Sequence, residues 1–334
     1  MGKAAFCRKR WIEGKEIKLK NMTKEPSTLN FSEKERICET NFISSGPYWH
    51  ICTDGTKMQA VFRTKHELDT AMWMLAKATC KTPEVHLITF EIMDNHIHLI
   101  AAGRLEDCIR MFETFRISIK KVVHRSGNIV DWKNFKATYI KIESLSALRN
   151  EIIYTNRNAF VANPNYTPCS YPWGGGCAYF CPWLEHLPTR KFEDLTIDTR
   201  RNLIHSKDLS HYSSLRVLGE NVHIPSFCDI SLGEGMFRDS RSYFMSLTRN
   251  SEAFSMIASR LKDSVFLTDE EIYSILISYI DKEFHIKQVA QLSPDQKLTS
   301  AKHLHFKYNA SNQQIRRMLR IDINILKEIF PEHT

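Results

Sequence analysis

The stretch that decides the fold of this chain reads Glu91-Ile92-Met93-Asp94-Asn95-His96-Ile97-His98-Leu99-Ile100. Apolar and β-branched residues begin at position 85, and Asp94-Asn95 supplies turn-forming side chains, so we expect a β-hairpin here. Alternate side chains of a strand share a face, so His96 and His98 project together while Ile97 points into the core. Two adjacent imidazoles make half of a divalent-metal site, although so short a pattern also fits a surface histidine pair that binds nothing.

The segments around the hairpin alternate between strand and helix patterns. Expected strands cover 47–53 and 135–142, and expected helices cover 66–79, 105–124 and 144–159. This order predicts an α+β fold in which helices pack on an antiparallel sheet, and residues 46–176 form this domain. Residues 1–45 are polar and basic, which favours a mobile tail that is either a solvated leader or an arm that contacts DNA. Residues 177–242 have weak periodicity and predict a connecting region packed on the first domain.

Residues 243–334 carry helical patterns and predict a second domain, an all-α bundle. Two of its expected helices are short, and a break at Arg320–Asp322 separates them. Short helices joined by a tight turn behind a supporting helix fit a helix-turn-helix, which we favour over a plain bundle because basic residues gather there. The candidate DNA contacts in this domain are Arg316, Arg317 and Arg320.

Composition limits the class of protein. With 334 residues and 43% hydrophobic residues, the chain is long enough for two globular domains. The net charge of +8 fits an anionic partner such as nucleic acid. Nine scattered cysteines, an odd number, favour reduced thiols and a cytoplasmic location. The uncharged run 158–184 contains prolines and a glycine triplet that would break a membrane helix, so we expect no membrane span.

A rival metal site lies in and just after the uncharged run. Cys169, Cys177, Cys181 and His186 are residue types that bind zinc. Their spacing is not a standard zinc pattern, and the glycine triplet interrupts it. We therefore favour the His96 and His98 pair as the metal site.

The second half of that site is expected in the helix over 144–159. Tyr154 and Asn158 are spaced i to i+4 and therefore lie on one helix face. Asn158 can offer an amide oxygen to a metal held by the two histidines, and Tyr154 can then act as a nucleophile. The alternative for Tyr154 is a packed aromatic residue with its hydroxyl at the surface. Glu151, one turn earlier, is a candidate fourth ligand or proton acceptor, or else a solvated helix charge.

These motifs resemble those of the single-tyrosine HUH transposases, and most closely the REP-associated tyrosine transposases. Residues 93–100 are similar to that family's Met-Pro-Asn-His-x-His-Leu-hydrophobic stretch, with Asp94 in place of the proline. Residues 148–158 resemble its Tyr-Ile-x-x-Asn-Pro helix end, although Ala159-Phe160 replaces the Pro-Val that follows. Tyr171-Pro172-Trp173-Gly174 resembles its downstream Tyr-x-Trp-Ser segment. The likeness covers roughly residues 46–176.

The resemblance implies an HUH endonuclease with a ferredoxin-like, RRM-like sandwich that nicks and joins single-stranded DNA, here at hairpin-bearing ends. In such an enzyme His96, His98 and Asn158 hold Mg²⁺ or Mn²⁺, and Tyr154 forms a 5′-phosphotyrosine. A homodimer is implied on DNA, because joining needs two DNA ends, although monomeric relatives exist. The Tyr154 helix can then meet the histidines of its own chain or of its partner's chain.

Two other functions remain open. The chain can be a domesticated regulatory protein that binds hairpin DNA without cutting it, or an HUH replication initiator, although no G-x-x-x-x-G-K-[ST] helicase motif appears. The predicted helix over 105–124 carries further candidate DNA contacts, for which an exposed charged helix face is the alternative. These candidates are Arg110, Arg116, Lys120 and Lys121.

Overall fold

The computed structural model describes residues 29–55, 58, 60–125, 127, 130–162, 166–249, 257, 267, 269–308 and 310–331. Buried apolar side chains in these ranges form two separate hydrophobic cores. The larger core collects residues between Tyr48 and Ile257, and the smaller one collects residues between Leu267 and Phe330. Every helix in these ranges is too short or too polar to cross a membrane.

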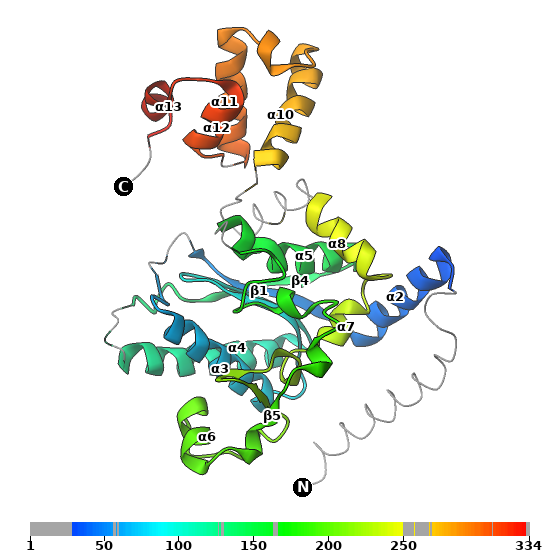
Figure 1. Ribbon diagram of the computed structural model, residues 1–334, viewed down its shortest axis with the longest axis vertical. Coiled ribbons are helices and arrows are strands. Elements are labelled where there is room, and N and C mark those ends of the chain that lie inside the picture. Colours follow the sequence, from blue (N-terminus) through cyan, green and yellow to red (C-terminus); the bar gives the residue numbers. More distant parts are fainter. Residues whose placement is uncertain are drawn as a thin grey trace.

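The first domain is a four-stranded antiparallel sheet with helices on both faces (Figure 1). Its elements are β1 (Tyr48–Thr53), α3 (Lys65–Lys81), β2 (His86–Ile92), β3 (Ile97–Ala102), α4 (Leu105–Arg125), β4 (Ala137–Ile142) and α5 (Leu145–Ala162). The strand order is β2-β3-β1-β4. This βαββαβ chain order with β1 and β3 in the centre is the ferredoxin-like arrangement, so the predicted α+β fold is confirmed.

The two faces of the sheet pack against different helices. Register places Ile51 opposite Leu99 on β3 and opposite Tyr139 on β4, and Phe112 of α4 contacts Tyr139 edge to face. Side chains that are directly opposite one another in an antiparallel pair share a face, so α4 covers the Ile51 face. The other face carries His50, which contacts α5. Figure 1 shows α3 and α4 on one side of the strands and α5 on the other.

The mobile tail predicted over residues 1–45 is wrong for residues 31–45, which form a helix, and residues 1–28 lie outside the described residues. Helix α2 covers Phe31–Ser45 and begins with a capping box, in which Asn30 accepts from the amide of Glu33 and Glu33 accepts from the amide of Asn30. Glu35 forms an ion pair with Arg149 of α5 at 2.7 Å. Helix α2 is therefore fastened to the first domain.

Residues 177–242 contribute to the first core rather than only joining two domains. Tyr179 and Phe192 are both buried in it. Short elements form here: η3 (Gly175–Ala178), η4 (Leu184–His186), β5 (Arg190–Lys191), η5 (Phe192–Asp194), α6 (Ile197–Ile204), β6 (Arg216–Leu218), β7 (Asn221–Val222), η6 (Ile224–Ser226) and α7 (Ile230–Glu234). Strands β5, β6 and β7 make a second small sheet.

The domain boundary predicted at residue 243 falls inside the first domain. Helix α8 (Ser240–Arg249) packs on α5 and not in the C-terminal core. Tyr243 stacks on Tyr179 with 5.2 Å between ring centroids, and its hydroxyl accepts a hydrogen bond from Asn156 Nδ2 at 2.9 Å. The second core therefore begins after α8.

The C-terminal bundle contains α10 (Asp269–Phe284), η7 (Val289–Gln291), α11 (Pro294–Tyr308), α12 (Asn312–Leu319) and α13 (Ile323–Ile329). Arg320 ends α12 in the left-handed conformation with φ 53°, and Asp322 caps α13 by accepting from the amide of Asn324 at 2.8 Å. The predicted pair of short helices with a tight turn is thus confirmed. An ion pair between Arg157 and Glu271 joins α5 to α10.

Candidate active site

His98 lies in the middle of the sheet, on the face that α5 covers. It is opposite Cys52 on β1 and opposite Glu91 on β2, so both of these side chains share its face. All three are almost completely buried, with 1%, 3% and 2% of their surfaces exposed. The prediction that His98 belongs to a strand is confirmed. Cys52 and Glu91 were not predicted as its neighbours.

A hydrogen-bonded chain leads from α5 to His98. Glu151 Oε2 lies 2.7 Å from His50 Nδ1, and His50 Nε2 lies 2.9 Å from His98 Nδ1. His50 and Glu151 are 0% and 1% exposed, so these contacts are shielded from water. Glu151 is therefore not a solvated helix charge, because its buried carboxylate binds His50.

His96 precedes β3 and is held by the loop that follows β1. Its Nδ1 lies 2.6 Å from Asn95 Oδ1, and Asn95 Nδ2 donates to the carbonyl oxygen of Gly55 at 3.1 Å. Gly55 leaves room for the imidazole, because a Cβ at this position would lie 2.8 Å from His96 Nδ1. The rings of His96 and His98 meet edge to face with 5.0 Å between centroids, as the His-x-His spacing predicts.

Tyr154 faces both inner histidines from α5. Its ring centroid lies 5.6 Å from that of His98 and 6.3 Å from that of His50. Tyr154 is 7% exposed, so its ring is packed, as the alternative of a packed aromatic residue expects. Two of the rings next to it are the imidazoles of His98 and His50, which that alternative does not predict. The predicted meeting of Tyr154 with the histidine strand therefore occurs within one chain.

The direction of α5 carries Asn158 toward His96. Glu151 contacts His50, which pairs with Ile100, and Tyr154 one turn later lies beside His98, two residues back along β3. A helical turn and two strand residues both advance about 5–7 Å, so the next turn of the helix approaches the level of His96. Asn158 is 9% exposed, and its Nδ2 has no hydrogen-bond partner among the described residues.

The Tyr171–Gly174 segment runs along the outer edge of β2. The amide of Ile92 donates to the carbonyl oxygen of Trp173 at 2.9 Å, and the Tyr171 hydroxyl donates to that of Ile92 at 2.7 Å. Gly174 forms an isolated antiparallel bridge with Glu91. Burial and the nearby Glu91 raise the pKa of Tyr171, which keeps this hydroxyl a donor. The motif thus supports the strand that carries Glu91.

His50, Cys52 and His98 also form a possible metal-binding group, because their ligand atoms all lie within 4.8 Å of one another. His50 and His98 are also joined by a hydrogen bond between His50 Nε2 and His98 Nδ1. Nδ1 of His98 therefore faces His50, and Nε2 lies on the other side of the ring.

The basic residues predicted on the helix over 105–124 lie away from the site. Helix α4 packs on the Ile51 face, so the sheet separates it from Tyr154. Arg110 pairs with Glu84 at 3.1 Å and with Asp107 at 2.9 Å, and Arg116 donates to the carbonyl oxygens of Phe135 and Trp132. Lys120 and Lys121 are exposed on the same helix. These four residues therefore do not border Tyr154.

The rival cysteine site is not assembled in the part of the chain that the structure describes. His50, Cys52 and His98 form the metal-ligand group there, and the predicted Cys169, Cys177, Cys181 and His186 do not. Cys177 donates its thiol hydrogen to the carbonyl oxygen of Gly174, and burial raises its pKa to about 12.

The chain matches no protein-family model, no curated protein and no solved structure.

Sequence reasoning missed His50, Cys52 and Glu91 as members of the site. His50 and Cys52 alternate on a strand in the way that His96 and His98 do, which is the available signal. Glu91 follows an apolar strand and precedes the turn, so its place opposite His98 depends on the hairpin register. That register becomes visible in the structure.

Proposed function

We propose that this protein is a metal-dependent endonuclease and strand transferase that cuts single-stranded DNA through a covalent phosphotyrosine at Tyr154. The observation that carries the proposal is the position of Tyr154, whose ring lies 5.6 Å from that of His98 in a buried group of three histidines. A hydroxyl beside imidazoles that can bind a divalent ion is the arrangement needed for attack on a phosphodiester. The resemblance to HUH transposases supports the same assignment.

The donor set fits a divalent ion such as Mg²⁺ or Mn²⁺. His96 and His98 would supply nitrogens, and Asn158, on the turn of α5 that approaches them, would supply an amide oxygen. Asn158 is 9% exposed, so an amide oxygen at this position would act in a site shielded from water. When bound, the ion supplies Lewis-acid polarisation of the scissile phosphate.

The proposed reaction is a transesterification, in which one phosphoester bond replaces another. The Tyr154 hydroxyl oxygen attacks the phosphorus and loses its proton, and the bond from phosphorus to the 3′ oxygen breaks. The departing 3′ oxygen takes up a proton, so one hydroxyl is consumed and one is released. Attack by the 3′ hydroxyl of another strand reverses the step and joins DNA without ATP.

The test is to trap the covalent adduct on single-stranded DNA that carries a hairpin. With Mg²⁺ or Mn²⁺ we expect a protein–DNA band that resists denaturation, and we expect Tyr154→Phe to abolish it while hairpin binding persists. Hairpin binding without any adduct in the unaltered protein would favour the domesticated, non-cleaving alternative. An adduct in the Tyr154→Phe protein would mean that another residue attacks.

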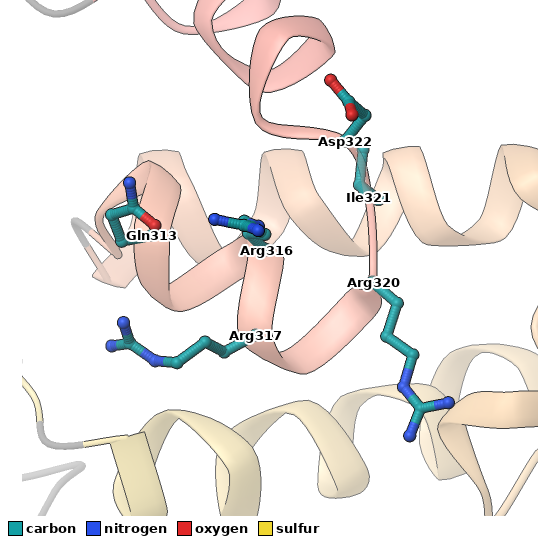
Figure 2. A pocket seen from close by; sticks show the side chains of 6 residues that line it. All are labelled: Gln313, Arg316, Arg317, Arg320, Ile321 and Asp322. Atoms are coloured by element: carbon teal, nitrogen blue, oxygen red, sulfur yellow. The ribbon is translucent and has the colours of Figure 1, made fainter.

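The C-terminal bundle offers a second DNA-binding surface. Figure 2 shows an open hollow that runs along α12 to the turn that follows it, bordered by Gln313, Arg316, Arg317, Arg320, Ile321 and Asp322. Arg317 is paired with Asp269 at 2.7 and 2.9 Å, whereas Arg316 and Arg320 are exposed and form no ion pair with the described residues. In a helix-turn-helix the first helix crosses the DNA backbone, which supports phosphate contacts for these two arginines.

Helix α13 would then be the helix that meets the bases. Its exposed side chains include Asn324, Lys327 and an isoleucine, Ile325, that is 47% exposed. An amide and an apolar group suit the edge of adenine and the methyl group of thymine. The C-terminal domain would therefore bind the duplex stem of a hairpin, while the first domain acts on its single-stranded flank.

The duplex contact is tested by the salt dependence of hairpin binding. Loss of two phosphate contacts to the duplex in an Arg316→Ala, Arg320→Ala protein should reduce the magnitude of the slope of log K against log salt by about 1.8. Arg110→Ala is the matched control, because Arg110 is an exposed arginine already paired with two carboxylates. An unchanged slope in the double variant, or an equal change in the control, would contradict the assignment.

A homodimer on DNA remains part of the proposal, because joining requires two ends. The contact between Tyr154 and His98 within one chain supports two self-sufficient sites rather than shared ones. We therefore expect that mixing Tyr154→Phe protein with His96→Ala protein restores no cleavage. Recovery of cleavage would mean that the partners exchange the α5 helix, and light scattering on DNA would give the number of chains.

A further inference from the structure

We propose that Glu151 and His50 act as positioning residues that set the tautomer of His98, so that its Nε2 presents a lone pair to the metal. This inference rests on the proposed function, since it concerns the metal site of that function. Both residues would act through His98 and would not contact the metal or the scissile phosphate themselves. Their contacts form the hydrogen-bonded chain between α5 and β3.

The direction of the chain follows from the chemistry of its first member. An ionised carboxylate accepts hydrogen bonds and donates none, so His50 Nδ1, 2.7 Å from Glu151 Oε2, must carry the hydrogen. The Nε2 of a neutral His50 is then an acceptor. With His50 neutral, His98 Nδ1, 2.9 Å away, donates to it, and the lone pair of His98 is left on Nε2.

His96 reaches the same tautomer by a different contact. Asn95 Nδ2 donates to the carbonyl oxygen of Gly55, so Asn95 turns its oxygen toward His96. His96 Nδ1 therefore donates, and Nε2 carries the lone pair. Both histidines of the His-x-His pair thus present the nitrogen that a metal requires, one through an amide and one through the Glu151–His50 pair.

Burial makes the pair effective. His50, His98 and Glu151 are 0%, 1% and 1% exposed, so water does not compete for these hydrogen bonds. Partners of metal-bound histidines fix ring orientation and tautomer, and their loss typically weakens metal binding by about 10- to 100-fold.

The first readout is Mn²⁺ affinity of the DNA-free protein, measured by electron paramagnetic resonance titration. We expect His50→Phe to weaken Mn²⁺ binding by about 10- to 100-fold, because no acceptor faces His98 Nδ1. In His50→Gln the amide oxygen can accept from His98 and the amide NH₂ can donate to Glu151, so affinity should stay close to that of the unaltered protein. His50→Gln also covers the case in which His50→Phe does not fold.

The second readout is the tautomer itself, from the ¹⁵N shifts of the imidazole nitrogens without metal. His98 should be protonated at Nδ1 in the unaltered protein and in His50→Gln. In Glu151→Gln the amide can donate to His50 Nδ1, which lets the chain reverse, so we expect part of His98 to carry its hydrogen on Nε2. A role limited to packing would leave these shifts unchanged.

The control is another histidine–carboxylate pair in the same sheet. His86 at the start of β2 lies 3.3 Å from Asp229, and register places it opposite Ala102, distant from His98. His86→Phe should leave Mn²⁺ affinity and the His98 tautomer unchanged. Unchanged affinity and an unchanged tautomer in His50→Phe would overturn the inference. If the tautomers are as expected but no phosphotyrosine forms, the positioning role stands and the proposed function fails.

Discussion

The two faces of the central sheet are equally buried but chemically opposite. On one face Ile51, Leu99 and Phe112 are each 0% exposed and pack with aromatic neighbours of α4 and β4. On the other face His50, His98 and Glu151 are 0%, 1% and 1% exposed, yet hydrogen bonds join them. Burying polar groups is costly unless they are paired. Burial alone therefore does not distinguish the hydrophobic core of this domain from its candidate site. The type of buried side chain, apolar or polar, does.

The largest effect should come from removing the His-x-His pair on the polar face. We expect a His96→Ala, His98→Ala protein to lose all metal-dependent cleavage, because both nitrogen ligands are gone. Ile97 keeps its place in the core, so the protein should remain folded by circular dichroism. Full cleavage in Mg²⁺ by this variant would show that the metal is held elsewhere.

A deletion on the apolar face should have the opposite signature. Phe112→Ala removes a fully buried ring that packs on Phe115, Phe135 and Tyr139, and we expect a loss of about 3–5 kcal/mol in the free energy of unfolding. Denaturant titration measures this loss. At a temperature where the variant stays folded, the amount of covalent adduct per folded molecule should be unchanged. Loss of the adduct without loss of stability would contradict the separate roles of the two faces.

Only part of this arrangement can be predicted from sequence. The hairpin and the order of strands and helices along the chain follow from local patterns, because period and turn residues are properties of short segments. The meeting of Tyr154 with the histidine strand joins distant segments, and its prediction rests on the resemblance and not on a local pattern. The pairing of Glu151 with His50 joins residues that are far apart in the chain, so it depends on how α5 crosses the sheet. Residues 177–242 form short elements held by tertiary packing, which leave little periodicity to detect.

A smaller effect is expected at the loop that holds His96. In Gly55→Ala the added Cβ would lie 2.8 Å from His96 Nδ1, so the imidazole must move away from Asn95. We expect Mn²⁺ affinity to fall by about tenfold, the lower end of the range for lost histidine partners, with a change in unfolding free energy below about 1 kcal/mol. Equal losses of affinity and stability would mean that the loop is structural and not specific to the site.

The smallest effect should come from the thiol beside His98. Cys52→Ser changes one atom in the His50–Cys52–His98 group, and we expect cleavage in Mg²⁺ to remain near that of the unaltered protein. Metal analysis of purified protein decides between the two sites that share His98. Stoichiometric zinc that disappears in Cys52→Ser would show that this group is the true metal site.

The central claim is that Tyr154 becomes covalently joined to DNA beside a metal held by His96 and His98. The most direct measurement is mass spectrometry of peptides from protein incubated with a single-stranded hairpin substrate and Mn²⁺. The account predicts a nucleotide attached to the peptide containing Tyr154, formed with Mn²⁺ and absent with a chelator. A modified peptide elsewhere, or the same adduct in the presence of the chelator, would contradict it.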